Sequence, residues 1–241
     1  MEGGAMNLAT INGAIKALCA EAPMMVAPQP GWRLRTEDEL FFDVVVCILS
    51  SQTLFELALA TAESLKRAGL IASARGGWGP AYEEAVCFAL RTPVLIERGG
   101  STSFVIPRFR NRVSKLVATT AQKIYGEGTT LKATLAAAGS PQEARRRLVA
   151  AVAGFGPKQA SLYLRRIGYC ADLAILDTHV LDYLELAAGI NPKPSSLSRL
   201  STYERLETEF RRVAEDFGYS VGCVDLATWI TMRVAKRGSV G

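Results

Sequence analysis

A glycine-interrupted pair of helices within residues 140–184 constrains the fold of this chain more than any other feature. Ser140-Pro141-Gln142-Glu143 has the composition of a helix start, with serine as the N-cap, proline in the first turn and glutamate reaching back to the cap. The turn Gly154-Phe155-Gly156 interrupts that helix, and Pro157 begins the next one. Such a hairpin points the first amides of the second helix outward, which suits an anion such as a DNA phosphate.

Two polar residues in this stretch have positions that packing alone does not require. Lys158 falls in the first turn of the second helix, where the helix dipole disfavours a cation and favours the free, nucleophilic amine. Asp177 follows in Leu-Asp-Thr-His, and a carboxylate can take a proton from an amine or stabilise a cationic sugar. The structural alternatives are a solvated first-turn lysine and an aspartate N-cap for a helix over 178–188. Neither residue decides between these interpretations by itself, and their combination is more informative.

Together these segments resemble the helix-hairpin-helix DNA glycosylase superfamily. The matching runs are Gly154–Ala160, which reads Gly-Phe-Gly-Pro-Lys-Gln-Ala, and Leu176–Val180, which reads Leu-Asp-Thr-His-Val. In that family the lysine of the G-x-G-x-K turn is the catalytic nucleophile and the later aspartate is the catalytic carboxylate. The resemblance therefore assigns these roles to Lys158 and Asp177. The hairpin alone would be a weak signal, because many non-enzymatic DNA-binding proteins carry one.

Within the superfamily, residues 160–169 and 174–177 are most similar to the compact 8-oxoguanine DNA glycosylase/lyases of archaea and some bacteria. The resemblance implies an all-α fold in which two helical lobes flank a DNA-binding cleft. The expected organisation is a single glycosylase unit over residues 1–241, with one lobe at 36–135 and the other at 7–35 plus 136–241, the latter containing the hairpin motif of 140–168.

The resemblance also implies how the hairpin region meets DNA. Gly154, Phe155 and Gly156 would grip a phosphate, and His179, the single histidine, would help to position the backbone. A monovalent cation bound by the hairpin backbone follows from the resemblance, whereas no side-chain spacing indicates a metal. The cysteines are scattered without a C-x-x-C pair, which argues against a zinc site. We expect no iron–sulfur cluster, because the four-cysteine loop of the endonuclease III-like relatives is absent. The cysteines are Cys19, Cys47, Cys87, Cys170 and Cys223.

A capping box at Thr36 opens a strongly apolar segment over residues 40–49. Its β-branched residues could form a strand by propensity alone. The cap, the length and the resemblance favour a buried helix instead. Just after it, superfamily members carry Gln or Asn at the place of Gln52, where the side chain enters the duplex as the base leaves. A polar residue at a helix end is the structural alternative.

An aromatic and basic run comes next, between an expected loop at 98–107 and an expected helix at 113–125. It resembles the aromatic-basic-Asn segment of the compact enzymes, which implies DNA contacts from Arg110 and Asn111. Phe109 is assigned to the base pocket, where an aromatic ring could stack on an extruded base, and Phe104 is the alternative. The basic residues fit a solvated helix face equally well; they are Arg108, Arg110, Arg112 and Lys115.

Near the C-terminus, Asp225-Leu226-Ala227-Thr228-Trp229 resembles a D-L-x-x-W run that lines the base pocket of the compact enzymes. Trp229 could stack on a flipped purine, and Asp225 could accept a hydrogen bond from its N–H edge. The structural alternative is a tryptophan packed on a terminal helix. The compact enzymes tend to end in a lysine whose terminal carboxylate helps to recognise the oxidised base, and this chain lacks it. The identity of the base therefore stays open.

Composition agrees with a DNA-acting protein. The net charge is +5 and the isoelectric point about 9.0, and 49% of residues are hydrophobic, so the chain can bury a core while attracting polyanions. No apolar run has the length of a membrane span and no signal segment is visible. The dispersed cysteines suit a reducing cytosol. We expect a cytoplasmic, nucleoid-associated monomer without membrane contact.

The predicted function is excision of a damaged or modified base from double-stranded DNA by a bifunctional glycosylase/AP lyase. Lys158 would form a Schiff base and β-elimination would cut the strand, with 8-oxoguanine as the first candidate base. One alternative keeps the chemistry but changes the base to an oxidised pyrimidine or a modified cytosine of viral DNA. Another is a non-catalytic helix-hairpin-helix DNA-binding module, which has no need of both Lys158 and Asp177.

Overall fold

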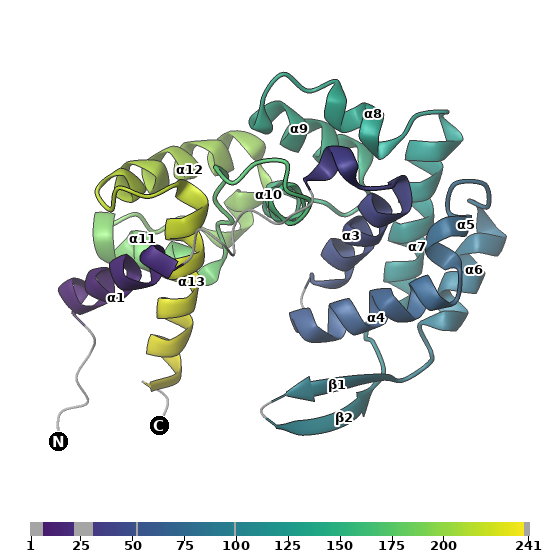
Figure 1. Cartoon of the computed structure of the whole chain (residues 1–241), viewed down its shortest axis with the longest axis horizontal. Coiled ribbons are helices and arrows are strands. Elements are labelled where there is room, and N and C mark those ends of the chain that lie inside the picture. Colours follow the sequence, from purple (N-terminus) through teal and green to yellow (C-terminus); the bar gives the residue numbers. More distant parts are fainter. Residues whose placement is uncertain (1–6, 22–30, 52, 99, 239–241) are drawn as a thin grey trace. The chain divides into compact units, whose positions relative to one another are not determined.

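The computed structural model describes residues 7–21, 31–51, 53–98 and 100–238. The predicted all-α class is confirmed, because the described residues are mostly helical and add only a two-stranded sheet (Figure 1). The chain divides into two compact units. One consists of residues 32–155, and the other combines the chain up to Gly31 with everything from Gly156 onward.

The unit of residues 32–155 is a helical layer with one hairpin of strands. Its elements are η1 (Trp32–Leu34), α3 (Glu37–Leu49), α4 (Phe55–Arg67), α5 (Leu70–Ser73), α6 (Pro80–Ala89), β1 (Val94–Arg98), β2 (Ser101–Val105), α7 (Arg110–Ala121), the π-helical turn η2 (Gln122–Gly126), α8 (Leu131–Ala136) and α9 (Pro141–Ala151).

Helix α3 is the buried centre of this unit, which confirms a helix where β-propensity favoured a strand. The predicted capping box is present: Thr36 Oγ1 accepts from the Glu39 amide at 3.3 Å, and the Glu39 carboxylate accepts from the Thr36 amide at 2.6 Å. Residues 44–47 are fully buried. A helix that is apolar on all sides is stable only when it is surrounded by protein, so packing overrides the local preference.

The segment expected to be a loop at 98–107 contains a strand. Strands β1 and β2 pair antiparallel, and Val94 lies opposite Val105. Val94 and Ile96 are buried against Leu57 of α4. The loop prediction was therefore wrong for 101–105, because alternate residues of β1 gain a buried surface only when α4 is in place.

The second unit consists of α1 (Leu8–Glu21), α10 (Pro157–Arg166), α11 (Thr178–Ala188), η3 (Pro194–Ser198), α12 (Leu200–Glu215) and α13 (Val221–Gly238). Its core joins α1 to the C-terminal helices: Ile11 and Ile15 pack with residues such as Tyr183 and Phe210. The N-terminal helix α1 thus belongs to the same compact unit as the C-terminal helices.

The boundary between the two compact units falls between Phe155 and Gly156. Helices α8 and α9 therefore belong with α3. A direct cause is Glu37, whose carboxylate accepts hydrogen bonds from the Leu131 and Lys132 amides at the start of α8. Among the described residues, no helix combines the length and apolar character that crossing a bilayer requires.

Candidate active site

The predicted hairpin lies between α9 and α10. Gly154 has φ +82°, and a Cβ atom there would come within 3.0 Å of the Leu116 side chain, so glycine is required on two grounds. Gly156 has ordinary extended backbone and is the N-cap of α10. The Phe155 side chain is buried, so contacts from this residue to a DNA phosphate would use its backbone.

Replacing Gly154 with alanine is expected to lower the free energy of unfolding by about 2–4 kcal/mol, because left-handed backbone strain and overpacking against Leu116 add. Gly156→Ala is the matched control, since its Cβ would lie 3.7 Å from the nearest atom, in Gln159. That control should cost less than about 1 kcal/mol. Urea unfolding of both variants measures the difference, and equal losses would contradict the assignment.

Lys158 occupies the second position of α10, directly after Pro157. Its side chain is half-buried. Within the described part of the chain its ammonium makes no hydrogen bond and no ion pair. The lysine is therefore held by a rigid helix start while its nitrogen stays available for a ligand.

Asp177 is the N-cap of α11, as the structural alternative proposed. Its Oδ1 accepts hydrogen bonds from the amides of His179 at 2.9 Å and Val180 at 3.0 Å. The other carboxylate oxygen has no hydrogen-bond partner among the described residues. Capping and catalysis are thus compatible: one oxygen fixes the carboxylate and the other can face a ligand.

The segment that leads into Asp177 is fixed by three buried side chains from α12 and α13. The Ala174 amide donates to Glu207 at 3.1 Å, the Ile175 amide to Asp225 at 2.8 Å, and the Leu176 amide to the Tyr203 hydroxyl at 3.0 Å. The Tyr203 hydroxyl in turn donates to the Ala174 carbonyl at 2.9 Å. Three consecutive backbone amides therefore have side-chain acceptors, which sets the position of the carboxylate that follows.

Asp225 also forms a buried ion pair with Arg165 of α10. Only 3% of Asp225 and 8% of Arg165 are exposed. Burial raises the pKa of the Asp225 carboxyl to about 6, against the opposing effects of the Arg165 guanidinium and the Ile175 amide; the nearby Asp177 charge raises it further. Because both oxygens already have protein partners, the predicted contact of Asp225 with a base stays a prediction.

Trp229 lies beside the first turn of α11. Its ring is 6.5 Å from the His179 imidazole in an edge-to-face arrangement, and the Arg233 guanidinium lies 4.8 Å from its centroid. The His179 Nδ1 atom is buried and has no hydrogen-bond partner among the described residues. The fold thus brings Asp177, His179 and Trp229 into one cluster, with a cation over the indole.

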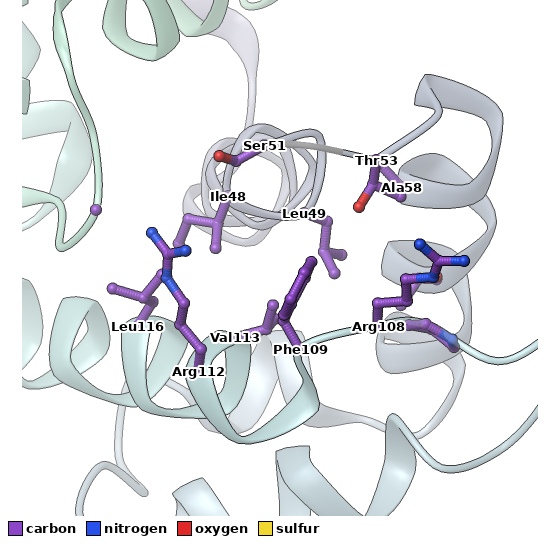
Figure 2. A pocket seen from close by; sticks show the side chains of 13 residues that line it. Ile48, Leu49, Ser51, Thr53, Ala58, Arg108, Phe109, Arg112, Val113 and Leu116 are labelled. Carbon is purple, nitrogen blue, oxygen red and sulfur yellow. The ribbon is translucent and has the colours of Figure 1, made fainter. Parts of the chain in front are cut away.

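The aromatic and basic run lies in the other unit, beside a pocket at the end of α3. Figure 2 shows Phe109 pointing toward Leu49, with Arg108 and Arg112 to either side. Phe109 has φ +57°, a left-handed conformation that is unusual for an aromatic residue. Ser51 and Thr53 line the same pocket, whereas Gln52 lies outside the described residues. At about 30 Å³ the pocket has room for water but not for a purine.

Arg110 and Asn111 are exposed in the first turn of α7. The Asn111 Oδ1 accepts a hydrogen bond from the Cys87 thiol at 3.3 Å. Phe104, the alternative aromatic, is 74% exposed on β2. Among the described residues there is no cluster of side chains that could hold a metal ion.

Sequence reasoning did not identify Arg165, Tyr203, Glu207 or Arg233 as site residues. A usable signal existed for Glu207, because it follows Tyr203 and Leu206 at helical spacing on the apolar face of α12. A carboxylate on such a face needs a buried partner. The sequence could not identify that partner, since the Ala174 amide lies 33 residues away.

Comparison with known proteins agrees with this geometry. The family model of 8-oxoguanine DNA glycosylase matches residues 104–219. An 8-oxoguanine DNA glycosylase/AP lyase of Saccharolobus islandicus is 33% identical over 123 residues, 51% of this chain and 58% of that protein. The one of Metallosphaera sedula is 38% identical over 97 residues, 38% of this chain and 44% of that protein. The chain thus spans little more than half the length of the curated relatives it matches.

Solved structures extend the likeness to nearly the whole chain. The 8-oxoguanine DNA glycosylase of Thermotoga maritima has a TM-score of 0.68 and 26% identity, covering 92% of this chain and 96% of that one. The 8-oxoguanine glycosylase/lyase of Methanocaldococcus jannaschii, in complex with 15mer DNA containing 8-oxoguanine, has a TM-score of 0.63 at 21% identity, covering 91% and 87%, a likeness of fold.

The helix-hairpin-helix geometry, the lysine and aspartate at two helix starts, and these matches define a DNA glycosylase fold. The chain is similar in sequence to the 8-oxoguanine DNA glycosylases over about half of its length, and it is similar to them in fold over nearly all of it.

Proposed function

We propose that this protein is a bifunctional DNA glycosylase/AP lyase that removes a damaged base, 8-oxoguanine in the first instance, from double-stranded DNA. The observation that carries the proposal is Lys158, a half-buried lysine fixed at the start of α10 and without a partner among the described residues. The names of the relatives support the choice of base.

In the proposed reaction, the extruded nucleotide presents its C1′ atom to the neutral Lys158 amine. The nitrogen attacks C1′, the C1′–N9 bond breaks, and the base leaves with the bonding electrons and takes up a proton. Asp177 stabilises the positive charge that develops on the sugar and accepts a proton from the attacking amine. The C1′–O4′ bond of the adduct then breaks, O4′ takes up a proton, and a Schiff base forms between C1′ and the lysine nitrogen. Loss of a C2′ proton then breaks the C3′–O3′ bond and releases the 3′ strand with a 5′-phosphate end.

The network before Asp177 favours an enzyme over a DNA-binding module. Buried polar and charged groups are costly unless every partner is present. Glu207, Asp225 and Tyr203 are all used to fix three backbone amides ahead of one carboxylate. A module that only binds phosphate needs the hairpin amides, but it gains nothing from a precisely held aspartate.

DNA contacts would come from both compact units. The hairpin Gly154, Phe155 and Gly156 would bind a phosphate through backbone amides, and His179 would contact the strand near Asp177. Arg110 and Asn111 would reach the duplex from the start of α7, with Gln52 filling the space of the lost base. Trp229 and Phe109 supply aromatic surfaces for an extruded or orphaned base.

The proposal includes a monovalent cation at the hairpin backbone. The carbonyl groups of Ala153 and Gly154 accept no hydrogen bond from the described residues, so they are free to coordinate a cation. Such a cation would connect the hairpin to a DNA phosphate. We further propose that the enzyme needs no other cofactor and acts as a monomer in the cytoplasm on chromosomal DNA.

Borohydride trapping on a panel of duplexes tests the proposal. One duplex carries 8-oxoguanine, and the others carry an abasic site, an oxidised pyrimidine or a modified cytosine. A covalent adduct on 8-oxoguanine is the expected result. Trapping on the abasic site alone, or on another modified base, would keep Lys158 as the nucleophile and change the substrate. No adduct on any duplex would overturn the enzymatic proposal in favour of the binding module.

A further inference from the structure

The β1–β2 hairpin turns an apolar face to solvent, and the proposed chemistry does not use it. Side chains alternate across the strands, so while Val94 and Ile96 are buried against α4, Leu95 points the other way. Leu95 lies directly opposite Phe104 in the ladder. These two side chains are 52% and 74% exposed, although a cross-strand apolar pair is normally a buried feature.

The apolar surface continues into the loop that follows β2. Only Val105 separates Phe104 from Ile106, which is 46% exposed, and Phe109 is 53% exposed three residues later. We name Leu95, Phe104 and Ile106 the hairpin face. Contiguous exposed apolar side chains of this kind mark interaction surfaces in folded proteins, whereas single exposed residues do not.

Cations border the hairpin face. Arg108, Arg110 and Arg112 are exposed, and they make no ion pair with the residues that the structure describes. Three arginines that lie within a stretch of five residues, and that form no ion pair with the described residues, create a local positive surface. A partner for the hairpin face must therefore combine negative charge with apolar surface.

Double-stranded DNA has this combination, because phosphates flank sugars and base edges. Proteins that bend DNA place Phe, Leu and Ile side chains against base steps while arginines bind nearby phosphates. A second copy of this chain fits less well. A two-fold interface would place each set of arginines against the same surface of its partner, and like charges would then oppose each other.

We propose that the hairpin face is a DNA-contacting surface, in which Leu95 and Phe104 pack on sugars and base edges while Arg108 and Arg110 bind the flanking phosphates. This inference rests on the proposed function, because that function supplies DNA as the ligand. The hairpin face would make a second DNA contact, through apolar side chains, in addition to the contact made by the backbone of residues 154–156. The energetic contribution of such a contact is nearly independent of salt, unlike that of phosphate contacts.

The test compares the full-length wild type with the Leu95→Ser/Phe104→Ser double variant on a duplex with a tetrahydrofuran abasic analogue, which the lyase cannot cut. Fluorescence anisotropy at several salt concentrations gives Kd and its salt dependence. We expect the double variant to bind about tenfold more weakly, as for the loss of one aromatic stacking contact, with an unchanged salt slope. Arg108→Gln should instead reduce the salt slope by about one.

Two controls keep the inference falsifiable. Leu34→Ser removes another highly exposed leucine of the same unit, 78% exposed, and should leave Kd unchanged. Leu95→Ile/Phe104→Tyr keeps the apolar surface, so it should bind like the wild type even if the serine variant is less stable. Affinity within twofold of wild type for the folded serine variant would overturn the inference.

Sedimentation without DNA gives a second outcome. Concentration-dependent dimers that the serine variant abolishes would mean that a second copy covers the face, and this too would overturn the inference. Borohydride trapping on an abasic-site duplex separates the two proposals. If the wild type is trapped normally and the Leu95→Ser/Phe104→Ser variant binds DNA as tightly as the wild type, only the inference about the hairpin face is wrong. If the wild type is not trapped at all, the proposed enzymatic function is wrong.

Discussion

Replacing Lys158 with glutamine is expected to abolish borohydride trapping and to slow base release and strand cleavage by roughly a thousandfold or more. Glutamine keeps the polarity of the side chain and is only one atom shorter, but it has no nucleophilic amine. The fold should be unaffected, because the Lys158 ammonium has no protein partner among the described residues. Single-turnover cleavage of the 8-oxoguanine duplex, with a thermal unfolding scan of the same sample, measures both effects.

Lys16→Gln is the matched control, since Lys16 is an exposed lysine on α1 in the same compact unit. Its trapping yield should equal that of the wild type. Residual trapping by the Lys158→Gln protein would mean that another amine forms the Schiff base. Base release without strand cleavage would mean that water can replace the lysine as the nucleophile, which would change the proposed mechanism.

The second large effect is expected at Asp225. Asp225→Leu should lower the free energy of unfolding by about 3–5 kcal/mol, because it leaves the buried Arg165 guanidinium and the Ile175 amide without an acceptor. It should also slow single-turnover excision with little change in Kd, since the residues before Asp177 lose one of their three fixed amides. Urea unfolding and single-turnover kinetics with excess enzyme measure the two losses separately.

Two further variants separate stability from positioning. Arg165→Met/Asp225→Leu removes the unpaired charge, so stability should largely recover while excision stays slow. Asp225→Asn keeps an acceptor for Ile175, so excision should be mostly retained. For comparison, Asp172→Asn breaks an exposed ion pair with Arg211 and should cost less than about 1 kcal/mol. Normal excision by the Arg165→Met/Asp225→Leu protein would contradict the positioning role.

The pH dependence of stability provides an independent readout of Asp225. Its pKa is raised from 3.8 to about 6 on folding, so the folded protein binds this proton more tightly than the unfolded chain. The contribution of Asp225 to the free energy of unfolding is therefore present at low pH and is lost as the pH rises from about 4 to about 6. Asparagine cannot titrate, so the stability of Asp225→Asn relative to wild type should increase over this interval.

Much of the fold follows from local sequence signals. The capping box at Thr36 and the N-cap serine at residue 140 mark helix starts that the structure contains. Gly154 marks a backbone position that only glycine occupies without strain. Each of these signals acts over a few residues, through hydrogen bonds or φ angles. The sequence therefore predicts these features without knowledge of the tertiary structure.

The β1–β2 hairpin shows where local signals fail. Residues 101–105 contain serines and a threonine and little apolar alternation, so they resemble a loop. They become a strand because β1 pairs with them and packs against α4. Strand formation there depends on long-range burial rather than on propensity.

The candidate site likewise combines residues that local signals identify with residues that only long-range packing brings together. The hairpin, Lys158 and Asp177 can be identified from the sequence, because a short motif at fixed spacing places the lysine in the first turn of one helix and the aspartate at the N-cap of the next. The contacts that hold Asp177 in place depend on tertiary packing. Glu207, Asp225 and Tyr203 reach the Ala174–Leu176 amides across 33, 50 and 27 residues, and Arg165 pairs with Asp225 across 60. Such contacts exist only once α10, α12 and α13 have packed, because nothing local in the chain specifies which buried polar groups will meet.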